Sequence, residues 1–179
     1  MEVLTADRVR AVLDYNPETG IFMWANRPLS DFANTQAYGA FVSRCLGREA
    51  GSPTMNGYRR ITVDRVKYLA HRLAWLHFYG TWPSQQIDHV NGDGCDNRIA
   101  NLRDVSNAEN HRNLRLMKTN RSGVAGVRFD ARYDNWAATI WEDAKIIHLG
   151  SFKSKDDAVA ARKAAERKLG YHPNHGRAA

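Results

Sequence analysis

Cysteine and long hydrophobic runs are both scarce in this sequence of 179 residues. The two cysteines, Cys45 and Cys95, are too far apart for a CxxC pair and too few for a zinc cluster, so we expect two reduced thiols. No stretch approaches the ~18 apolar residues of a membrane span. Charged residues such as Glu2 and Arg8 stand where a signal peptide needs an apolar run. These absences exclude disulfide scaffolds and membrane proteins, and they predict a cytoplasmic protein without a membrane partner.

Acidic residues are also few, since 19 Asp and Glu stand against 26 Lys and Arg, a formal net charge of +7. An excess of this size is often only solvated surface, so its placement matters more than its size. Between His111 and Phe129 there is no acidic residue and there are five cations: Arg112, Arg115, Lys118, Arg121 and Arg128. This segment is typical of a surface that binds a polyanion.

The periodicity of the first part of the chain predicts short mixed elements. They are a helix over residues 5–15, a strand over 21–24, a hairpin over 57–69 and a helix over 70–79. Residues 27–46 lack strong periodicity, and we expect an irregular surface excursion there. His71 and His77 lie six residues apart on the last helix and share no face, so we interpret them as packing or hydrogen-bonding residues rather than metal ligands.

The remainder of the chain predicts a helix and then a small sheet covered by another helix. Ser106 and Glu109 form a capping box for a helix over residues 106–116, and Ser154 caps a helix over 154–169. Between these helices, alternation predicts strands over residues 124–130, 136–142 and 145–150. The fold class is therefore α+β, with residues 171–179 as a loose tail.

The polar segment that begins at Asp88 contains the residue types needed to cleave a phosphodiester. Such cleavage requires a base for the attacking water and positive charge for the phosphate and the leaving oxygen. A hard divalent ion prefers oxygen ligands, and Asp88 and Asn110 supply a carboxylate and an amide. His89 supplies an imidazole that is largely neutral near pH 7. Neighbours on a strand point to opposite sides, so spacing alone does not bring Asp88 and His89 together.

Three blocks in order, IDHVNG at 87–92, DNRIANLR at 96–103 and Glu109-Asn110, resemble the HNH endonuclease motif of the phage and intron homing type. Residues 68–75 resemble the helix that leads into this motif. The resemblance implies a ββα-metal finger in which Asp88 and Asn110 hold one Mg²⁺ or Mn²⁺ ion. It also implies that His89 is the general base and that Asn101 orients His89 or cross-links the finger loop. His111 stays open as an alternative to Asn110 for the last ligand.

Other interpretations of the polar segment are simpler. Asp96, Asn97 and Arg98 are interpreted as turn formers. The run from Asn91 to Gly94 looks like the start of a calcium loop, but Leu102 stands where an EF-hand needs its bidentate Glu. We therefore exclude a calcium loop.

Strand alternation in the second part predicts an uncovered sheet face rich in cations, aromatics and hydroxyls. Its members are Arg128, Thr139, Trp141 and His148, with Arg132 and Lys145 at the rims. Phe129 and Ile147 are expected on the face that the helix covers. The runs GVAGVR at 123–128, WAATI at 136–140 and HLGSF at 148–152 resemble the ethylene-response-factor DNA-binding domain, which implies a three-stranded sheet in the major groove of double-stranded DNA. The alternative is that Trp141 and His148 only cap a small core.

The sequence thus predicts a nuclease module at residues 1–116 with its ββα-metal core at about 84–115, a basic linker at 117–122 and a DNA-binding module at 123–170. The expected activity is that of a metal-dependent homing endonuclease, which as a monomer nicks one strand. A non-enzymatic DNA-binding regulator that keeps the HNH scaffold is the competing interpretation. A toxin or defence nuclease with little site preference is a third.

Overall fold

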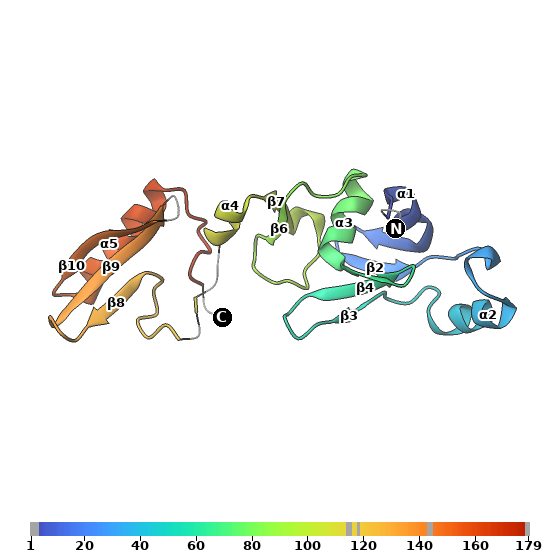
Figure 1. The fold of residues 1–179 in the computed structure, drawn as a ribbon, viewed down its shortest axis with the longest axis horizontal. Coiled ribbons are helices and arrows are strands. Elements are labelled where there is room, and N and C mark those ends of the chain that lie inside the picture. The colour runs from blue at the N-terminus through green and yellow to red at the C-terminus, as the bar shows by residue number, and fades with distance from the viewer. Residues whose placement is uncertain (1–3, 114–115, 118, 143–144, 178–179) are drawn as a thin grey trace. The chain divides into compact units, whose positions relative to one another are not determined.

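The computed structural model describes residues 4–113, 116–117, 119–142 and 145–177, and the side chains of Ala108 and His111 also lie outside this description. The chain forms two compact units, Met1–Ser106 and Asn107–Ala179, each built from helices and small antiparallel sheets. It is therefore an α+β protein (Figure 1). No helix among these described residues has the length and apolar character needed to cross a bilayer.

The first unit begins with a helix followed by a hairpin. Helix α1 (Ala6–Val12) is capped by the Thr5 side chain, and strand β1 (Leu13–Asn16) follows it and pairs with β2 (Ile21–Trp24). The sequence predicted one helix through residue 15. The helix ends earlier because Leu13, which is fully buried, pairs with Trp24 in the hairpin.

Residues 27–46, predicted to be irregular, contain a 3₁₀ turn η1 (Leu29–Asp31) and helix α2 (Thr35–Arg44). The Asn34 side chain caps α2 by accepting a hydrogen bond from the Ala37 amide at 2.8 Å. Phe41 packs edge-on against Trp24, with ring centroids 6.1 Å apart. Contacts to a distant strand thus stabilise a helix none of whose residues is buried.

A second hairpin precedes the central helix of the first unit. Strands β3 (Ser52–Pro53), β4 (Arg59–Val63) and β5 (Val66–Leu69) form a three-stranded antiparallel sheet. Helix α3 (Ala70–Tyr79) follows directly, and both the hairpin and the helix match the prediction from the sequence. Ile61 and Leu73, both fully buried, join these elements in the core.

The last elements of the first unit are β6 (Gln86–His89), a 3₁₀ turn η2 (Ile99–Asn101) and β7 (Leu102–Val105). Strands β6 and β7 pair antiparallel, and Ile87 and Leu102 pack into the same core as α3. This packing fixes the short hairpin to the unit.

The second unit begins with helix α4 (Asn107–His111), which is shorter than the predicted helix over 106–116. Beyond it, backbone groups bond to the C-terminal segment, because the Arg112 carbonyl accepts from the His172 amide at 3.2 Å. The segment predicted to be a loose tail is held over residues 171–177. Tyr171 donates to the Trp141 carbonyl at 2.7 Å, and Arg177 donates to the Asn113 carbonyl at 2.9 Å.

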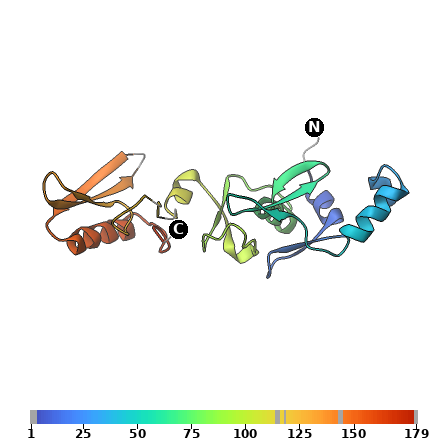
Figure 2. The same cartoon turned by 90° about the horizontal axis from the view of Figure 1, so that it is seen from below.

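The rest of the second unit is a sheet covered by a helix, as the sequence predicted. Strands β8 (Val127–Asp130), β9 (Asn135–Glu142) and β10 (Lys145–Phe152) form an antiparallel sheet with β9 in the centre. Helix α5 (Lys155–Lys168), capped by Ser154, lies along this sheet (Figure 2). Val127, Ala138 and Ala158 form the small buried core between them.

A buried arginine fastens this helix to the sheet. Arg162 donates through Nη1 to the Thr139 carbonyl and through Nε to Glu166 Oε1 at 2.9 Å. Its Nη2 lies 3.1 Å from Nε2 of His175. A Cβ at Gly126 would lie 2.3 Å from the Thr139 oxygen, so only glycine allows this close approach.

Candidate functional site

The β6–β7 hairpin places the two residues expected to carry chemistry side by side in a buried position. Asp88 pairs with Arg103 across the hairpin, and His89 pairs with Leu102. Asp88 is 7% exposed and His89 is 5% exposed. Their side chains have different neighbours, because the Asp88 carboxylate contacts Arg103 whereas the His89 ring lies beside two other rings.

Asn101 cross-links the loop between the two strands of the finger. Its Nδ2 donates to Asn91 Oδ1 at 3.0 Å and to the Asp96 carbonyl at 2.8 Å, and its Oδ1 accepts from the Asn91 amide at 2.9 Å. Asn101 is itself buried. These contacts correspond to the second of the two roles expected from the sequence, cross-linking the loop.

The loop residues interpreted as turn formers do bond within the loop. Asp96 forms an ion pair with Arg98 at 2.6 Å, and the hydrogen bonds from Arg98 keep the pKa of the Asp96 carboxyl below its usual value despite partial desolvation. The Asn97 side chain donates to the Cys95 carbonyl at 3.1 Å. The loop also contacts the first hairpin, because the Tyr15 hydroxyl donates to the Asn97 carbonyl at 2.7 Å. The finger is therefore anchored from outside as well as from within.

His89 lies against the rings of His71 and Tyr58, which come from α3 and from the loop before β4. The ring centroids of His89 and His71 are 5.0 Å apart, and those of His89 and Tyr58 are 5.9 Å apart. His71 is 5% exposed, and its Nδ1 atom has no hydrogen-bond partner among the described residues. The sequence placed His71 in a helix near the motif but gave no sign that it lies beside His89.

Both imidazoles are held in the neutral form. Burial lowers the pKa of His89, and a hydrogen bond with Asn97 and the charges of Asp88, Asp93 and Asp96 oppose this effect only in part. Burial, with smaller contributions from His89 and Arg72, lowers the pKa of His71 to about 3. A neutral imidazole can accept a proton, so His89 has the protonation state that a general base needs at pH 7.

Arg103 is a site residue that the sequence analysis missed. Its guanidinium donates to Oδ2 of Asp88, its partner across the hairpin. A carboxylate offers about four lone-pair positions, so it can bind both a guanidinium and a divalent cation. The donor type at Asp88 thus fits a hard cation, although the neighbouring arginine charge competes with it.

Asn110, the expected amide ligand, lies in α4 of the second unit. The pairing of Asp88 with Asn110 therefore stays a prediction from the sequence, as does the choice between Asn110 and His111. In the parts of the chain that the structure describes, no group of three or more His, Cys, Asp or Glu side chains has the arrangement to hold a metal ion. The expected pair of ligands, one carboxylate and one amide, contains only one side chain of these four types and so is not a group of this kind.

The sheet of the second unit brings together the residues predicted to read DNA. Thr139 pairs with His148, and Trp141, which lies on the same side of β9 as Thr139, pairs with Ile146. Arg128 pairs with Ala137, which also lies on that side of β9. Trp141 is 57% exposed, and Arg128 and His148 are also exposed. The Thr139 hydroxyl lies 3.3 Å from the Gly126 carbonyl and is partly buried. Trp141 does not cap a core at this face.

The helix-facing side of this sheet differs from the prediction at two positions. Phe129 is 50% exposed and Ile147 is 37% exposed, although both were expected under the helix. Phe129 lies at the end of the β8–β9 hairpin and Ile147 on the edge strand β10, where α5 leaves side chains open to solvent.

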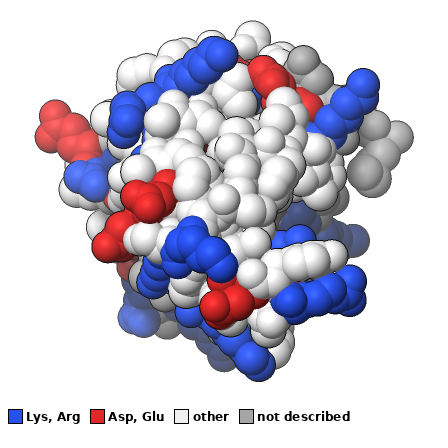
Figure 3. Space-filling model, turned by 90° about the vertical axis from the view of Figure 1, so that its left-hand side faces the viewer, with Lys and Arg blue, Asp and Glu red and all other residues white. Residues whose placement is uncertain are grey.

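The remaining cations predicted to bind DNA lie at the rims or in the segment before the sheet. Arg121, Arg132 and Lys145 are exposed and Arg112 is half-buried, while Arg115 and Lys118 lie outside the described residues. Figure 3 shows an end of the second unit where a broad uncharged area is bordered by Lys and Arg with some Asp and Glu among them.

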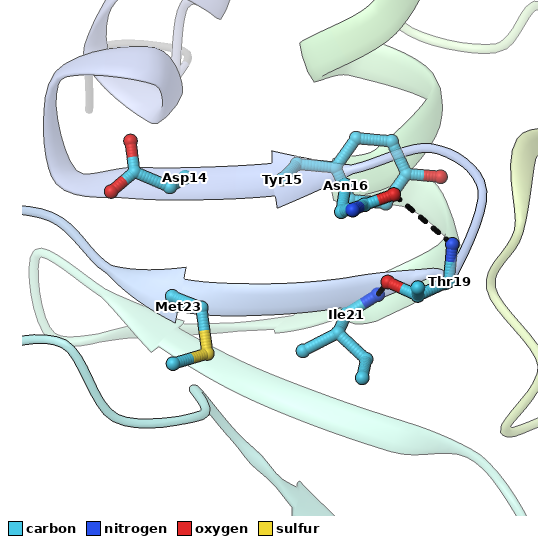
Figure 4. A pocket seen from close by; sticks show the side chains of 6 residues that line it. All are labelled: Asp14, Tyr15, Asn16, Thr19, Ile21 and Met23. Atoms are coloured by element: carbon cyan, nitrogen blue, oxygen red, sulfur yellow. Dashed lines mark hydrogen bonds between the residues drawn. The ribbon is translucent and has the colours of Figure 1, made fainter.

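A pocket lies on the β1–β2 hairpin (Figure 4), whose Tyr15 also contacts the finger loop. Its lining consists of Asp14, Tyr15, Asn16, Thr19, Ile21 and Met23. Asn16 Oδ1 accepts from the Thr19 amide at 3.1 Å, which closes the turn. Its lining has one carboxylate and no cation or histidine, so this pocket lacks the imidazole base that the finger offers beside a carboxylate.

Comparisons with known proteins agree with the position of the finger. A family model described as HNH endonuclease matches residues 68–112, from within β5 to the residue after α4. The chain is also 30% identical over 87 residues to Protein 3.8 of Escherichia phage T7, a match that covers 48% of this chain and 69% of that relative. No solved structure matches the chain.

Proposed function

This chain belongs to the HNH endonuclease family, and on that basis we propose that it hydrolyses phosphodiester bonds of DNA with the help of a divalent metal ion. The observation that carries the proposal is the β6 strand, where a neutral buried histidine directly follows a buried carboxylate. The loop beside this pair is cross-linked by Asn101 and anchored by Tyr15. Such preorganisation is what a hydrolytic site needs.

Each residue then has a chemical role. Asp88 and Asn110 would hold one Mg²⁺ or Mn²⁺ ion, which when bound neutralises phosphate charge and supports the leaving oxygen. His89 takes a proton from water, and the resulting hydroxide attacks phosphorus. The bond from phosphorus to the 3′-oxygen breaks and that oxygen takes a proton from solvent water, which leaves a 5′-phosphate and a 3′-hydroxyl. Asn101 keeps the loop next to His89 in place.

The second unit would select the site of cleavage on double-stranded DNA. The sheet face that carries Arg128, Thr139, Trp141 and His148 combines cationic, hydroxyl and aromatic groups, and this mixture suits base edges and phosphates in the major groove. Together with the phage relative, it supports a role as a phage or mobile-element homing endonuclease.

Nicking of supercoiled plasmid tests the nuclease. We expect relaxed circles with Mg²⁺ or Mn²⁺, no cleavage with EDTA, and a loss of at least two orders of magnitude in His89→Ala, because a general base contributes about 10²- to 10⁴-fold. DNA binding by His89→Ala in a mobility-shift assay serves as the control for folding. Binding without nicking by the unaltered chain in either metal would instead identify a DNA-binding regulator on an HNH scaffold.

A further inference from the structure

The β3–β4–β5 sheet of the first unit has one buried face and one polar face. Ile61 and Val63 of β4 are fully buried, so the residues that alternate with them, Arg60 and Thr62, point to solvent. Thr62 pairs with Lys67 of β5, and Arg60 pairs with Ser52 of β3. Residues paired across antiparallel strands point to the same side, so Ser52, Arg60, Thr62 and Lys67 share this face, which we call the outer face.

The outer face is positively charged and its cations are not neutralised. Among the described residues, Arg60 and Lys67 have no ion pair, whereas neighbouring Arg59 bonds Glu49 at 2.8 Å. The acid nearest in sequence, Asp64 at the β4–β5 turn, binds Arg8 at 2.9 Å and Arg27 at 3.2 Å. A hollow on the outer face is lined by Ser52, Pro53, Thr54, Met55, Asn56, Arg60, Thr62 and Lys67. This lining contains two cations, three hydroxyls and no carboxylate, the combination that binds phosphate groups.

The outer face leads directly to the finger. The loop between β3 and β4 packs against the finger loop, because a Cβ at Gly94 would lie 2.5 Å from the Gly57 carbonyl and 2.7 Å from the Tyr58 ring. Cys95 Sγ lies 3.5 Å from the same Gly57 carbonyl. Tyr58, one residue before β4, places its ring 5.9 Å from that of His89. The cationic strand therefore begins beside the candidate general base.

We propose that the outer face binds the phosphates of the DNA strand that enters the HNH site, with Arg60 and Lys67 as its phosphate-binding cations. This proposal rests on the proposed function, which it extends by assigning a DNA contact to the first unit as well as to the second. Arg60 and Thr62 are two and four residues beyond Tyr58, or roughly 7 and 13 Å along the strand at about 3.3 Å per residue. With about 3.4 Å of helix axis per nucleotide, these positions correspond to phosphates roughly two to four nucleotides from the cleaved bond.

The salt dependence of DNA binding tests the proposal without relying on cleavage. The double variant Arg60→Gln/Lys67→Gln is made in a full-length His89→Ala chain, and affinity for a DNA duplex is measured over a series of salt concentrations without metal. The matched control is Arg44→Gln/Arg48→Gln, which removes the same charge from exposed positions at the end of α2 and just beyond it. Thermal melting verifies that each variant is folded.

We expect the slope of log affinity against log salt to become shallower by about 2 in Arg60→Gln/Lys67→Gln, since each phosphate contact contributes about 0.9. The loss should be the same on every DNA sequence, as phosphate contacts carry no base readout. The control should keep the parental slope. An unchanged slope in the outer-face variant, an equal change in both variants, or no DNA binding by the parent would each overturn the proposal.

Neutral phosphates locate the contact once the cleavage position is mapped. Duplexes with methylphosphonate linkages two to four nucleotides from that position should bind the parent more weakly and leave the affinity of Arg60→Gln/Lys67→Gln unchanged. If both proteins lose affinity equally, the outer face is not the contact. If the expected salt slopes are found but the chain never nicks DNA, the outer-face contact is supported and the proposed nuclease activity is refuted.

Discussion

The ring of His71 packs edge-on against the ring of His89, with centroids 5.0 Å apart and planes inclined at 79°. His71 belongs to α3 and His89 to β6, so this contact joins the central helix of the first unit to the finger. Burial keeps the pKa of both rings below the usual histidine value, and the contact is therefore between two neutral imidazoles at pH 7.

The first prediction tests whether His71 supports His89 by packing alone. His71→Phe keeps a ring beside His89 and removes a buried nitrogen that has no partner among the described residues, so we expect nicking rates within a few-fold of the parent and equal or higher stability. His71→Ala leaves a cavity and should lower the free energy of unfolding by about 2–3 kcal/mol. Plasmid nicking and chemical denaturation measure the two effects. If His71→Phe is folded yet inactive, the imidazole takes part in the reaction.

The second prediction concerns the loop of the finger. Asn101→Asp keeps the acceptor for the Asn91 amide but loses the Nδ2 donor to Asn91 Oδ1 and the Asp96 carbonyl. We expect the free energy of unfolding to fall by about 2 kcal/mol, because each such hydrogen bond contributes about 1 kcal/mol and the acceptors left without a donor are partly buried. Limited proteolysis should show earlier cutting within residues 91–98. An equally resistant loop in Asn101→Asp would mean that these bonds do not hold it.

The third prediction concerns site selection by the second unit. Arg128→Ala removes an exposed cation of the β8–β10 sheet, and the loss of a bidentate contact to guanine corresponds to about 1–3 kcal/mol of discrimination. We expect a weaker preference for the natural site with unchanged metal-dependent cleavage of generic DNA. Arg167→Ala removes an exposed cation from α5 and serves as the control. Equal site preference in the parent and in Arg128→Ala would refute a role of Arg128 in base recognition.

The fourth prediction uses the buried ion pair between Arg162 and Glu166, both of which belong to α5. Burial raises the pKa of Glu166, but hydrogen bonds from Lys163 and Arg162 outweigh burial, so the folded-state pKa lies below the ordinary value of 4.5. Ionised Glu166 therefore stabilises the fold above about pH 4.5, and this contribution disappears as the pH falls through the folded-state pKa. Glu166→Gln should be less stable than the parent by about 2–3 kcal/mol at pH 7.

The pH dependence distinguishes this ion pair from simple packing. Denaturation curves of the parent and of Glu166→Gln should converge as the pH is lowered below 4.5, because the parent then loses the charge that the variant never had. A stability difference that stays constant from pH 7 into the acid range would show that Glu166 acts through its shape and not through its charge.

Local signals determined much of the secondary structure. The helix over residues 70–79 and the hairpin before it follow from apolar spacing and a two-residue turn, and Ser154 marks the start of α5. Helix α2 was not predictable in this way, since none of its residues is buried and its Phe41 depends on Trp24 and Phe32. The order in the C-terminal segment likewise depends on Asn113 and Trp141, which are distant in sequence.

For the site, the sequence alone determined the order of the motif residues and the strand alternation of the second unit, because motif spacing and strand period are properties of the chain itself. The motif residues are Asp88, His89, Asn101 and Asn110. The alternation gathers Arg128, Thr139, Trp141 and His148 on one face. Tertiary structure alone decided that His71 and Tyr58 surround His89 and that Arg103 binds Asp88. It also decided that β4, which carries Arg60 and pairs with the strand of Lys67, begins beside the finger. These relationships arise from packing between elements far apart in sequence, and no local propensity or periodicity specifies which elements meet.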